Sequence, residues 1–130
     1  MNQFEPVTVP ELPPVNPTYS QAACFGDLIL VSGQLGIDPA TRALVDGGVA
    51  AQTRQALENL SMILKSAGSS LEKVGKVNIY MVNMGELAAM NEVYRTYFTA
   101  NRPAKTTVQV SGLDKGALIE IEAVAAVGRP

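Results

Sequence analysis

The most constraining feature of this 130-residue sequence is its last long stretch, residues 103–127, which reads PAKTTVQVSGLDKGALIEIEAVAAV. Residues 105–110 alternate polar and β-branched apolar side chains, and residues 118–127 form a longer apolar run, so both segments are predicted strands. Gly112, Asp114 and Gly116 supply turn chemistry between them. We therefore interpret the stretch as a hairpin that organises the rest of the chain.

The second strand of this stretch has two unlike faces, because side chains alternate across a pleat. One face is wholly apolar, whereas the other carries Leu118, Glu120, Glu122, Val124 and Ala126. A solvent-exposed face rarely carries so many apolar residues, and a buried face rarely carries two unpaired carboxylates. We therefore expect another copy of the chain to cover this face, with the carboxylates at a cleft and Lys105 as the nearest cation in sequence.

Composition excludes several classes of function. The chain contains no His, which removes the usual general base and the commonest metal ligand. Cys24 is its single cysteine, so an internal disulfide is excluded and a reducing, cytoplasmic location is expected. Nucleotide-binding glycine loops are absent, the net charge is −2, and no apolar run is long enough for a membrane span. We expect no cofactor, no metal, no membrane partner and no nucleic-acid partner.

Apolar periodicity predicts the remaining elements within one domain, residues 1–130. Strands are expected near 7–9, 19–23, 28–32 and 74–82, and helices over 49–67 and 86–100, each with an apolar stripe. Two helices on one face of a mixed six-stranded sheet would bury these stripes, which makes the fold class α+β. The stripe of the first helix should pack against Leu30, Ile79 and Ile121.

Several short motifs together resemble the Rid family of reactive-intermediate deaminases, also called the YjgF or L-PSP family. They cover nearly the whole chain after its proline-rich first residues: 17–22 (PTYSQA), 31–34 (VSGQ), 55–59 (QALEN), 90–94 (MNEVY), 102–104 (RPA) and 119–125 (IEIEAVA). The resemblance implies a chorismate-mutase-like fold, assembled as a homotrimer with small-molecule clefts between subunits. That assembly agrees with the uncovered sheet face inferred above.

The resemblance also implies site residues. Glu120 matches the family's catalytic carboxylate, and the residues that match its substrate-binding positions are Tyr19, Ser32, Asn91, Lys105 and Thr107. Two of these depart from the deaminase pattern, since Lys105 stands where the deaminases have Arg and Thr107 stands where many have Cys. Lys offers a compact charge rather than the flat two-bond fork of a guanidinium, so it should hold a substrate carboxylate more loosely.

Each of these residues also has a purely structural interpretation. Glu120 could form an intersubunit or cross-strand salt bridge, and Lys105 could be a solvated or paired strand lysine. Tyr19 could pack, Ser32 could bond its own turn, and Asn91 could contact a neighbouring loop. Glu122 is assigned a structural role and Cys24 that of a packed thiol.

Three functions follow from the resemblance. The first is a cofactor-independent hydrolase acting on C–N bonds, which converts a small enamine or imine, such as 2-aminoacrylate or a 2-aminomuconate-like compound, to a carbonyl product and ammonia. The second is a trimer that binds small carboxylates without turnover and acts in regulation. The third is the ribonuclease or translation-inhibitor activity attributed to some relatives, which ranks last because the chain has no basic stripe.

Overall fold

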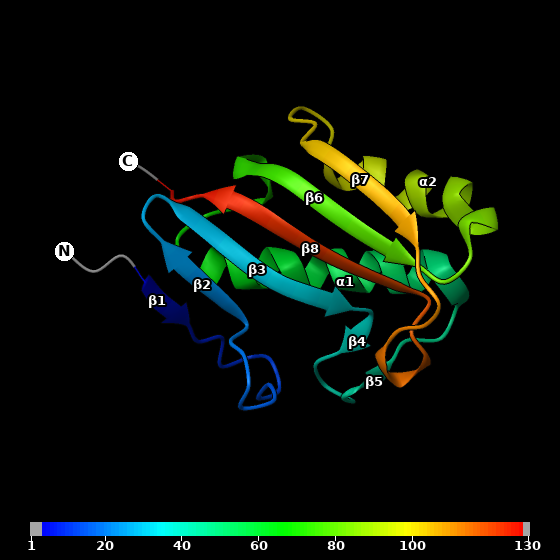
Figure 1. Ribbon diagram of the computed structural model, residues 1–130, viewed down its shortest axis with the longest axis horizontal. Helices are drawn as coiled ribbons and strands as arrows, with labels where there is room; N and C mark the ends of the chain where they lie inside the picture. The colour runs from blue at the N-terminus through cyan, green and yellow to red at the C-terminus, as the bar shows by residue number, and fades with distance from the viewer. Residues whose placement is uncertain (1–3, 129–130) are drawn as a thin grey trace.

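The computed structural model describes residues 4–128, which form a mixed six-stranded sheet, two α-helices and a small separate hairpin (Figure 1). The sheet strands are β1 (Phe4–Val7), β2 (Ala22–Phe25), β3 (Leu28–Leu35), β6 (Val74–Met81), β7 (Ala104–Gln109) and β8 (Ile119–Ala126). The hairpin pairs β4 (Ile37–Asp38) with β5 (Ala43–Leu44), and the helices are α1 (Gly48–Ser66) and α2 (Leu87–Tyr97). Single 3-10 turns cover Leu71–Lys73, Met84–Glu86 and Asp114–Gly116.

The strand order in the sheet is β1-β2-β3-β8-β6-β7, so β8 lies near the centre and β7 at an edge. All pairs are antiparallel except β6 and β7, which are parallel and are joined by α2. A parallel pair needs a crossover connection, and a helix is the usual one. The chain thus contains one β-α-β unit at one edge of an otherwise antiparallel sheet.

Both helices lie on the same face of this sheet (Figure 1). The inward stripe of α1 is fully buried at Ala56, Leu57, Leu60, Ile63 and Leu64, as the 3.6-residue periodicity predicts. It packs with the helix-facing residues of the sheet in one apolar core that includes Ile79 and Ile121. Burial of this stripe stabilises the fold, since each of its Leu and Ile side chains is worth about 1.5–3 kcal/mol.

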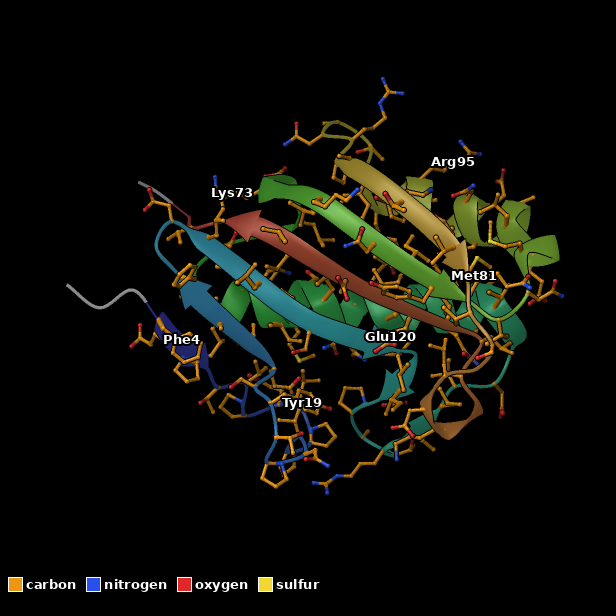
Figure 2. All side chains as sticks on the ribbon, viewed as in Figure 1. Phe4, Tyr19, Lys73, Met81, Arg95 and Glu120 are labelled. Atoms are coloured by element: carbon orange, nitrogen blue, oxygen red, sulfur yellow. The ribbon has the colours of Figure 1, made fainter. Side chains whose placement is uncertain are left out.

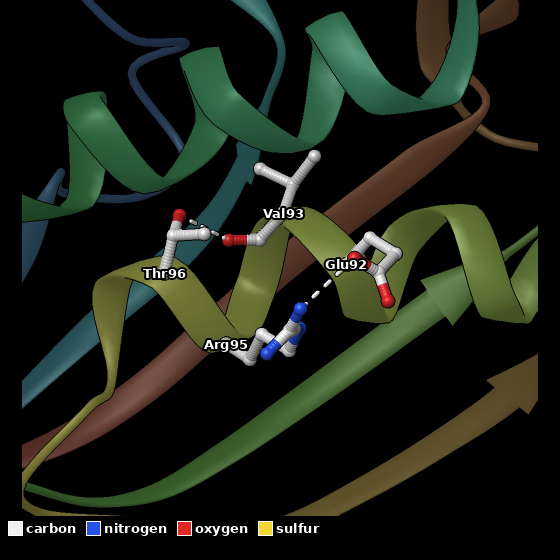
Figure 3. Close-up of polar contacts among 4 residues, drawn as sticks. All are labelled: Glu92, Val93, Arg95 and Thr96. Atoms are coloured by element: carbon white, nitrogen blue, oxygen red, sulfur yellow. Dashed lines mark hydrogen bonds and ion pairs between the residues drawn. The ribbon is translucent and has the colours of Figure 1, made fainter.

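Helix α2 begins after a 3-10 turn that Asn83 caps, its side-chain oxygen accepting a hydrogen bond from the Gly85 N–H at 2.9 Å. On the outer side of α2, Arg95 Nη2 pairs with Glu92 Oε1 at 3.2 Å, and Thr96 Oγ1 donates to the Val93 carbonyl at 2.6 Å (Figure 3). Both charged side chains are about 70% exposed, so this salt bridge adds little to stability. Buried Met90 and Tyr94 hold the helix to the core instead.

The opposite face of the sheet has no helix over it in residues 4–128. Strand register places exposed apolar side chains there, because Phe4, Phe25, Leu28 and Ala126 occupy one row of partners and Leu30 pairs with Val124 in another. Polar residues share its centre, where Tyr80 pairs with Glu120 and Asn78 with Glu122. We call this the open face.

The predicted hairpin over residues 103–127 is wrong. Strands β7 and β8 are not neighbours, because β6 lies between them and pairs with both. The loop between β7 and β8 therefore crosses the end of β6 rather than making a tight turn. Without the hairpin, Lys105 also does not pair with Glu120 or Glu122 of the same chain. Lys105 shares a row with buried Val77 on the helix-covered face, whereas both glutamates lie on the open face.

Two apolar residues also lie elsewhere than predicted. Leu30 is 41% exposed on the open face, and its neighbours Ile29 and Val31 face the helices. Leu118 was expected on the open face, but it precedes β8 and packs against the core. The first two strands are displaced by a few residues, to 4–7 and 22–25. Within residues 4–128, no helix has the length and apolar character needed to cross a bilayer.

Candidate functional site

A break in the pairing of β3 with β8 positions the Glu120 side chain. The register shifts between Val31 and Gln34, which leaves Ser32 and Gly33 in an irregular stretch. The Glu120 carboxylate lies over Gly33, where an added Cβ would stand 2.1 Å from Oε2. Only glycine leaves room for the carboxylate in this position.

Glu120 lines a pocket of about 350 Å³ at the end of β3. The pocket walls come from six segments: the N-terminal loop, β3, the β4–β5 hairpin, α1, the loop before β8 and β8 itself. Figure 2 labels Tyr19 on the first of these segments and Glu120 beside the end of β3. The polar lining residues are Tyr19, Gln21, Gln34, Arg42, Asn59, Asp114, Lys115 and Glu120.

The pocket walls are fixed by hydrogen bonds from α1. Asn59 is 3% exposed, and its Nδ2 donates to the Ile37 carbonyl at 2.9 Å, which holds the β4–β5 hairpin in place. Gln52 Oε1 accepts a hydrogen bond from the Leu118 N–H at 2.9 Å, which holds the loop before β8. These two buried polar side chains therefore anchor two segments of the pocket wall to the same helix.

The electrostatic surroundings of Glu120 favour its protonated form. Partial burial, followed by the negative charges of Glu122 and Asp114, raises the pKa of Glu120 above its usual value. Glu122 is better satisfied, since its Oε2 accepts a hydrogen bond from Asn78 Nδ2 at 3.1 Å. Glu120 is thus a half-buried carboxylate in a pocket with a pKa shifted toward neutral pH, which is the property expected of a general base.

Ser32 and Tyr19 lie near Glu120 but have different roles. Ser32 Oγ donates to the Ser20 carbonyl at 2.6 Å, so its hydroxyl ties the N-terminal loop to β3. Tyr19 is 53% exposed and lines both the Glu120 pocket and an adjoining hollow on the open face, which Ser32 and Glu122 also line. Tyr19 is therefore free to contact a ligand.

Lys105, Asn91 and Thr107 form a second group between β7 and α2. The Lys105 ammonium donates to Asn91 Oδ1 and stands 4.2 Å from the centroid of the Tyr94 ring. Partial burial lowers the pKa of Lys105, and burial raises the pKa of Tyr94 to about 12. Thr107 Oγ1 and the Tyr94 hydroxyl are buried without a hydrogen-bond partner among the described residues.

Six residues are predicted to share one site at a cleft between subunits, and within one chain they fall into two groups. Tyr19, Ser32 and Glu120 lie around the end of β3, on the side of the open face. The group around Lys105 lies on the helix-covered face at the β7 edge. One copy of the chain does not place Lys105 beside Glu120.

The sequence interpretation missed several lining residues of the Glu120 pocket. Arg42 and Lys115 come from turns with no periodic pattern, and both have left-handed backbone angles, with φ of 63° and 59°. Asn59 belongs to a resemblance motif, but helical periodicity alone could not predict that its side chain anchors the β4–β5 hairpin. Among the described residues, no group of three or more His, Cys, Asp or Glu side chains is placed to hold a metal ion.

Comparison with known families and proteins places this geometry in context. The family model described as Endoribonuclease L-PSP matches residues 10–127. A RutC family protein of Pyrococcus horikoshii is 49% identical over 112 residues, which are 86% of this chain and 88% of that protein. The 2-iminobutanoate/2-iminopropanoate deaminase of Rattus norvegicus is 46% identical over 110 residues, covering 85% of this chain and 80% of the deaminase.

Solved structures agree with the fold over nearly the whole chain. A Rid family protein of unknown function from Yersinia pestis, YyfA, superposes with a TM-score of 0.92 at 38% identity, covering 95% of this chain and 99% of that one. The TdcF protein of E. coli with bound serine superposes with a TM-score of 0.88 at 30% identity, covering 94% and 98%.

Proposed function

Because the chain belongs to the Endoribonuclease L-PSP family, also known as the YjgF or Rid family, we propose that it hydrolyses a small imine or enamine acid to an oxo acid and ammonia. Relatives named 2-iminobutanoate/2-iminopropanoate deaminase, at about 45% identity, support this reaction class. The observation that carries the proposal is the position of the Glu120 carboxylate, which lies over Gly33 and lines the pocket. Its surroundings also raise the pKa of Glu120.

Glu120 would act as the general base for addition of water to the C=N carbon. The carboxylate takes one proton from the water as the water oxygen bonds to carbon, and it passes this proton to the imine nitrogen as the C=N π bond opens. When the resulting amino alcohol collapses, the hydroxyl proton is transferred to the amino nitrogen, the carbonyl forms, the C–N bond breaks and ammonia leaves. One imine and one water thus yield one carbonyl compound and one ammonia, with no oxidant or cofactor.

The separation of the two groups of site residues leads us to propose a homotrimeric assembly with the cleft between copies. Strand β7 is a sheet edge, and the open face beside Glu120 carries exposed Phe25, Leu28 and Leu30. If β7 of a neighbouring copy packs near this face, its Lys105 reaches the pocket. There the lysine would bind the substrate carboxylate, and backbone groups at Thr107 would bind the nitrogen.

The direct test is ammonia release from 2-iminobutanoate, generated freshly by an amino-acid oxidase because the imine also hydrolyses spontaneously. The wild-type protein should exceed the spontaneous rate, and Glu120→Gln should return it to that rate. A matched control is Glu92→Gln, which removes a carboxylate on the outside of α2. A wild-type rate equal to the spontaneous rate would refute the proposed reaction.

A second candidate function is binding of small amino or oxo acids without turnover. Two observations favour it: TdcF of E. coli has been crystallised with bound serine, and the cation at position 105 here is engaged by Asn91 and Tyr94. This candidate predicts saturable binding of 2-oxobutanoate together with no ammonia release above the spontaneous rate. Calorimetry and the ammonia assay on one preparation distinguish the two functions.

A further inference from the structure

The Glu120 pocket contains two cations that the proposed reaction does not use. Arg42 lies in the turn between β4 and β5, and Lys115 lies in the 3-10 turn before β8. These two turns both line the pocket, and each brings one positive charge to it. Neither side chain has a hydrogen-bond or ion-pair partner among residues 4–128.

Both cations stand on backbone that is held in place. The Arg42 N–H donates to the Asp38 carbonyl at 2.7 Å, and Asp38 Oδ1 accepts from the Ala40 N–H at 2.8 Å, which closes the first turn. The second turn is closed by the Ala117 N–H on the Asp114 carbonyl at 3.1 Å. Asn and Gly adopt left-handed angles with the least strain. Arg and Lys stand in these turns at φ of 63° and 59° instead.

An anionic ligand would need cations in this pocket, because the pocket also contains carboxylates. Glu120 and Asp114 both line the cavity and would repel a carboxylate that enters it. Arg42 and Lys115 offset those two charges. A cation that has no protein partner keeps its donors available for a ligand oxygen, and a charge-assisted hydrogen bond is the strong kind.

The pocket is large enough for a ligand of this class. Ligand pockets in proteins commonly measure about 300–1,000 Å³, and the cavity of about 350 Å³ lies at the small end of that range. It therefore has room for a small acid that carries a second carboxylate.

We infer that Arg42 and Lys115 form a subsite for a second, distal carboxylate, so that the chain prefers dicarboxylic imine acids over monocarboxylic ones. The inference rests on the proposed function for the identity of the reacting group, which is the imine carbon next to Glu120. The distal carboxylate binds the cations of the same chain that supplies Glu120. Lys105 of a neighbouring copy is left for the carboxylate next to the imine.

Binding of two oxo acids that are not hydrolysed tests the subsite separately from the reaction. We would titrate the wild-type protein with 2-oxobutanoate and 2-oxoglutarate by calorimetry and compare the two dissociation constants. The wild type should bind the dicarboxylate about 10-fold or more tightly, the gain expected from one charge-assisted hydrogen bond. Equal dissociation constants for the two acids would overturn the inference.

The variants test whether the ratio of the two dissociation constants depends on the pocket cations. Arg42→Gln with Lys115→Gln should abolish the preference, and the charge-conserving Arg42→Lys with Lys115→Arg should retain it. Both pairs keep non-glycine residues in the turns, so backbone strain is matched. Lys73→Gln with Arg95→Gln removes the same net charge away from the pocket (Figure 2) and should leave the ratio unchanged. A preference that survives loss of both pocket cations would also overturn the inference.

Ammonia release from the corresponding imines then tests the proposed reaction separately from the proposed subsite. If neither imine is hydrolysed but the binding preference depends on Arg42 and Lys115, the proposed reaction fails and the subsite stands. If the monocarboxylic imine is hydrolysed as efficiently as the dicarboxylic one, the reaction stands and the subsite is refuted.

Discussion

Gly33 and Glu120 depend on each other: the carboxylate of Glu120 occupies the space that any side chain at residue 33 would fill. The backbone of Gly33 does not need a left-handed conformation, so its conformational freedom is not what the position requires. The empty space above its Cα is the requirement, and it places the proposed base against the pocket.

Gly33→Ala should therefore reduce activity far more than stability. The new methyl group displaces a flexible carboxylate rather than backbone, so we expect the melting temperature to change by only a few degrees. Misplacement of a catalytic group by about 1 Å can cost about 100-fold in rate, and we expect a loss of that order in kcat/KM. Gly75→Ala is the matched control, because a Cβ there meets nothing within 4 Å. Equal losses in the two variants would disprove the dependence.

Glu120→Gln should change stability in a pH-dependent way. A carboxyl whose pKa is raised by folding binds protons more tightly in the folded state, so stability falls as the pH rises from the unfolded pKa through the folded one. Above that window the charged carboxylate is a constant penalty that the amide lacks. The variant should therefore melt higher than the wild type at pH 7, and the difference should shrink toward pH 4. A variant that melts lower at pH 7 would show that Glu120 is stabilised by a partner.

Lys105→Arg should increase hydrolysis of 2-aminoacrylate, which we expect to be weak in the wild type. The guanidinium supplies a two-bond fork for the substrate carboxylate, and one added charge-assisted bond is worth about 1.5–3 kcal/mol, or roughly 10- to 150-fold. Lys73→Arg makes the same change at an exposed position and should have no effect. A wild type already fully active on this substrate, and weakened by Lys105→Arg, would contradict the role we assign to this lysine.

The homotrimer can be tested at Leu30, which is 41% exposed in the middle of the open face. Light scattering of the wild type at micromolar concentration should give three times the chain mass of 13.7 kDa. Leu30→Glu places a charge in the proposed interface and should lower that mass. Ala88→Glu adds the same charge to the exposed side of α2 and should not. A monomeric wild type would rule out the proposed assembly.

Much of the secondary structure could be predicted because it follows from local periodicity. The stripe of α1 and the alternation in β6 each identify a buried face from a few consecutive residues. The phase of the run Leu28–Ser32 could not be predicted, since Leu28, Ile29, Leu30 and Val31 are all apolar and either alternate set could face the helices. The structure buries Ile29 and Val31.

Strand pairing was the larger error, and the chain contained a signal for it. Residues 74–110 read strand, helix, strand, which is the pattern of a parallel β-α-β crossover. Strand β7 pairs in parallel with one side of β6, and β8 pairs with the other side. Strands β7 and β8 are therefore not neighbours and cannot form a hairpin. The proximity of Arg42, Lys115 and Glu120 carries no comparable signal, because it depends on how two separate turns are anchored to α1.

The measurement that tests the account most directly is complementation between two inactive variants, Glu120→Gln and Lys105→Ala, dissociated together and reassembled in equal amounts. If each site takes Glu120 from one copy and Lys105 from its neighbour, about a quarter of the sites in the mixture contain both native groups, because symmetric assembly draws them independently. The account predicts that ammonia release recovers to about that fraction of the wild-type rate. Release that stays at the level of the separate variants would contradict a site shared between copies.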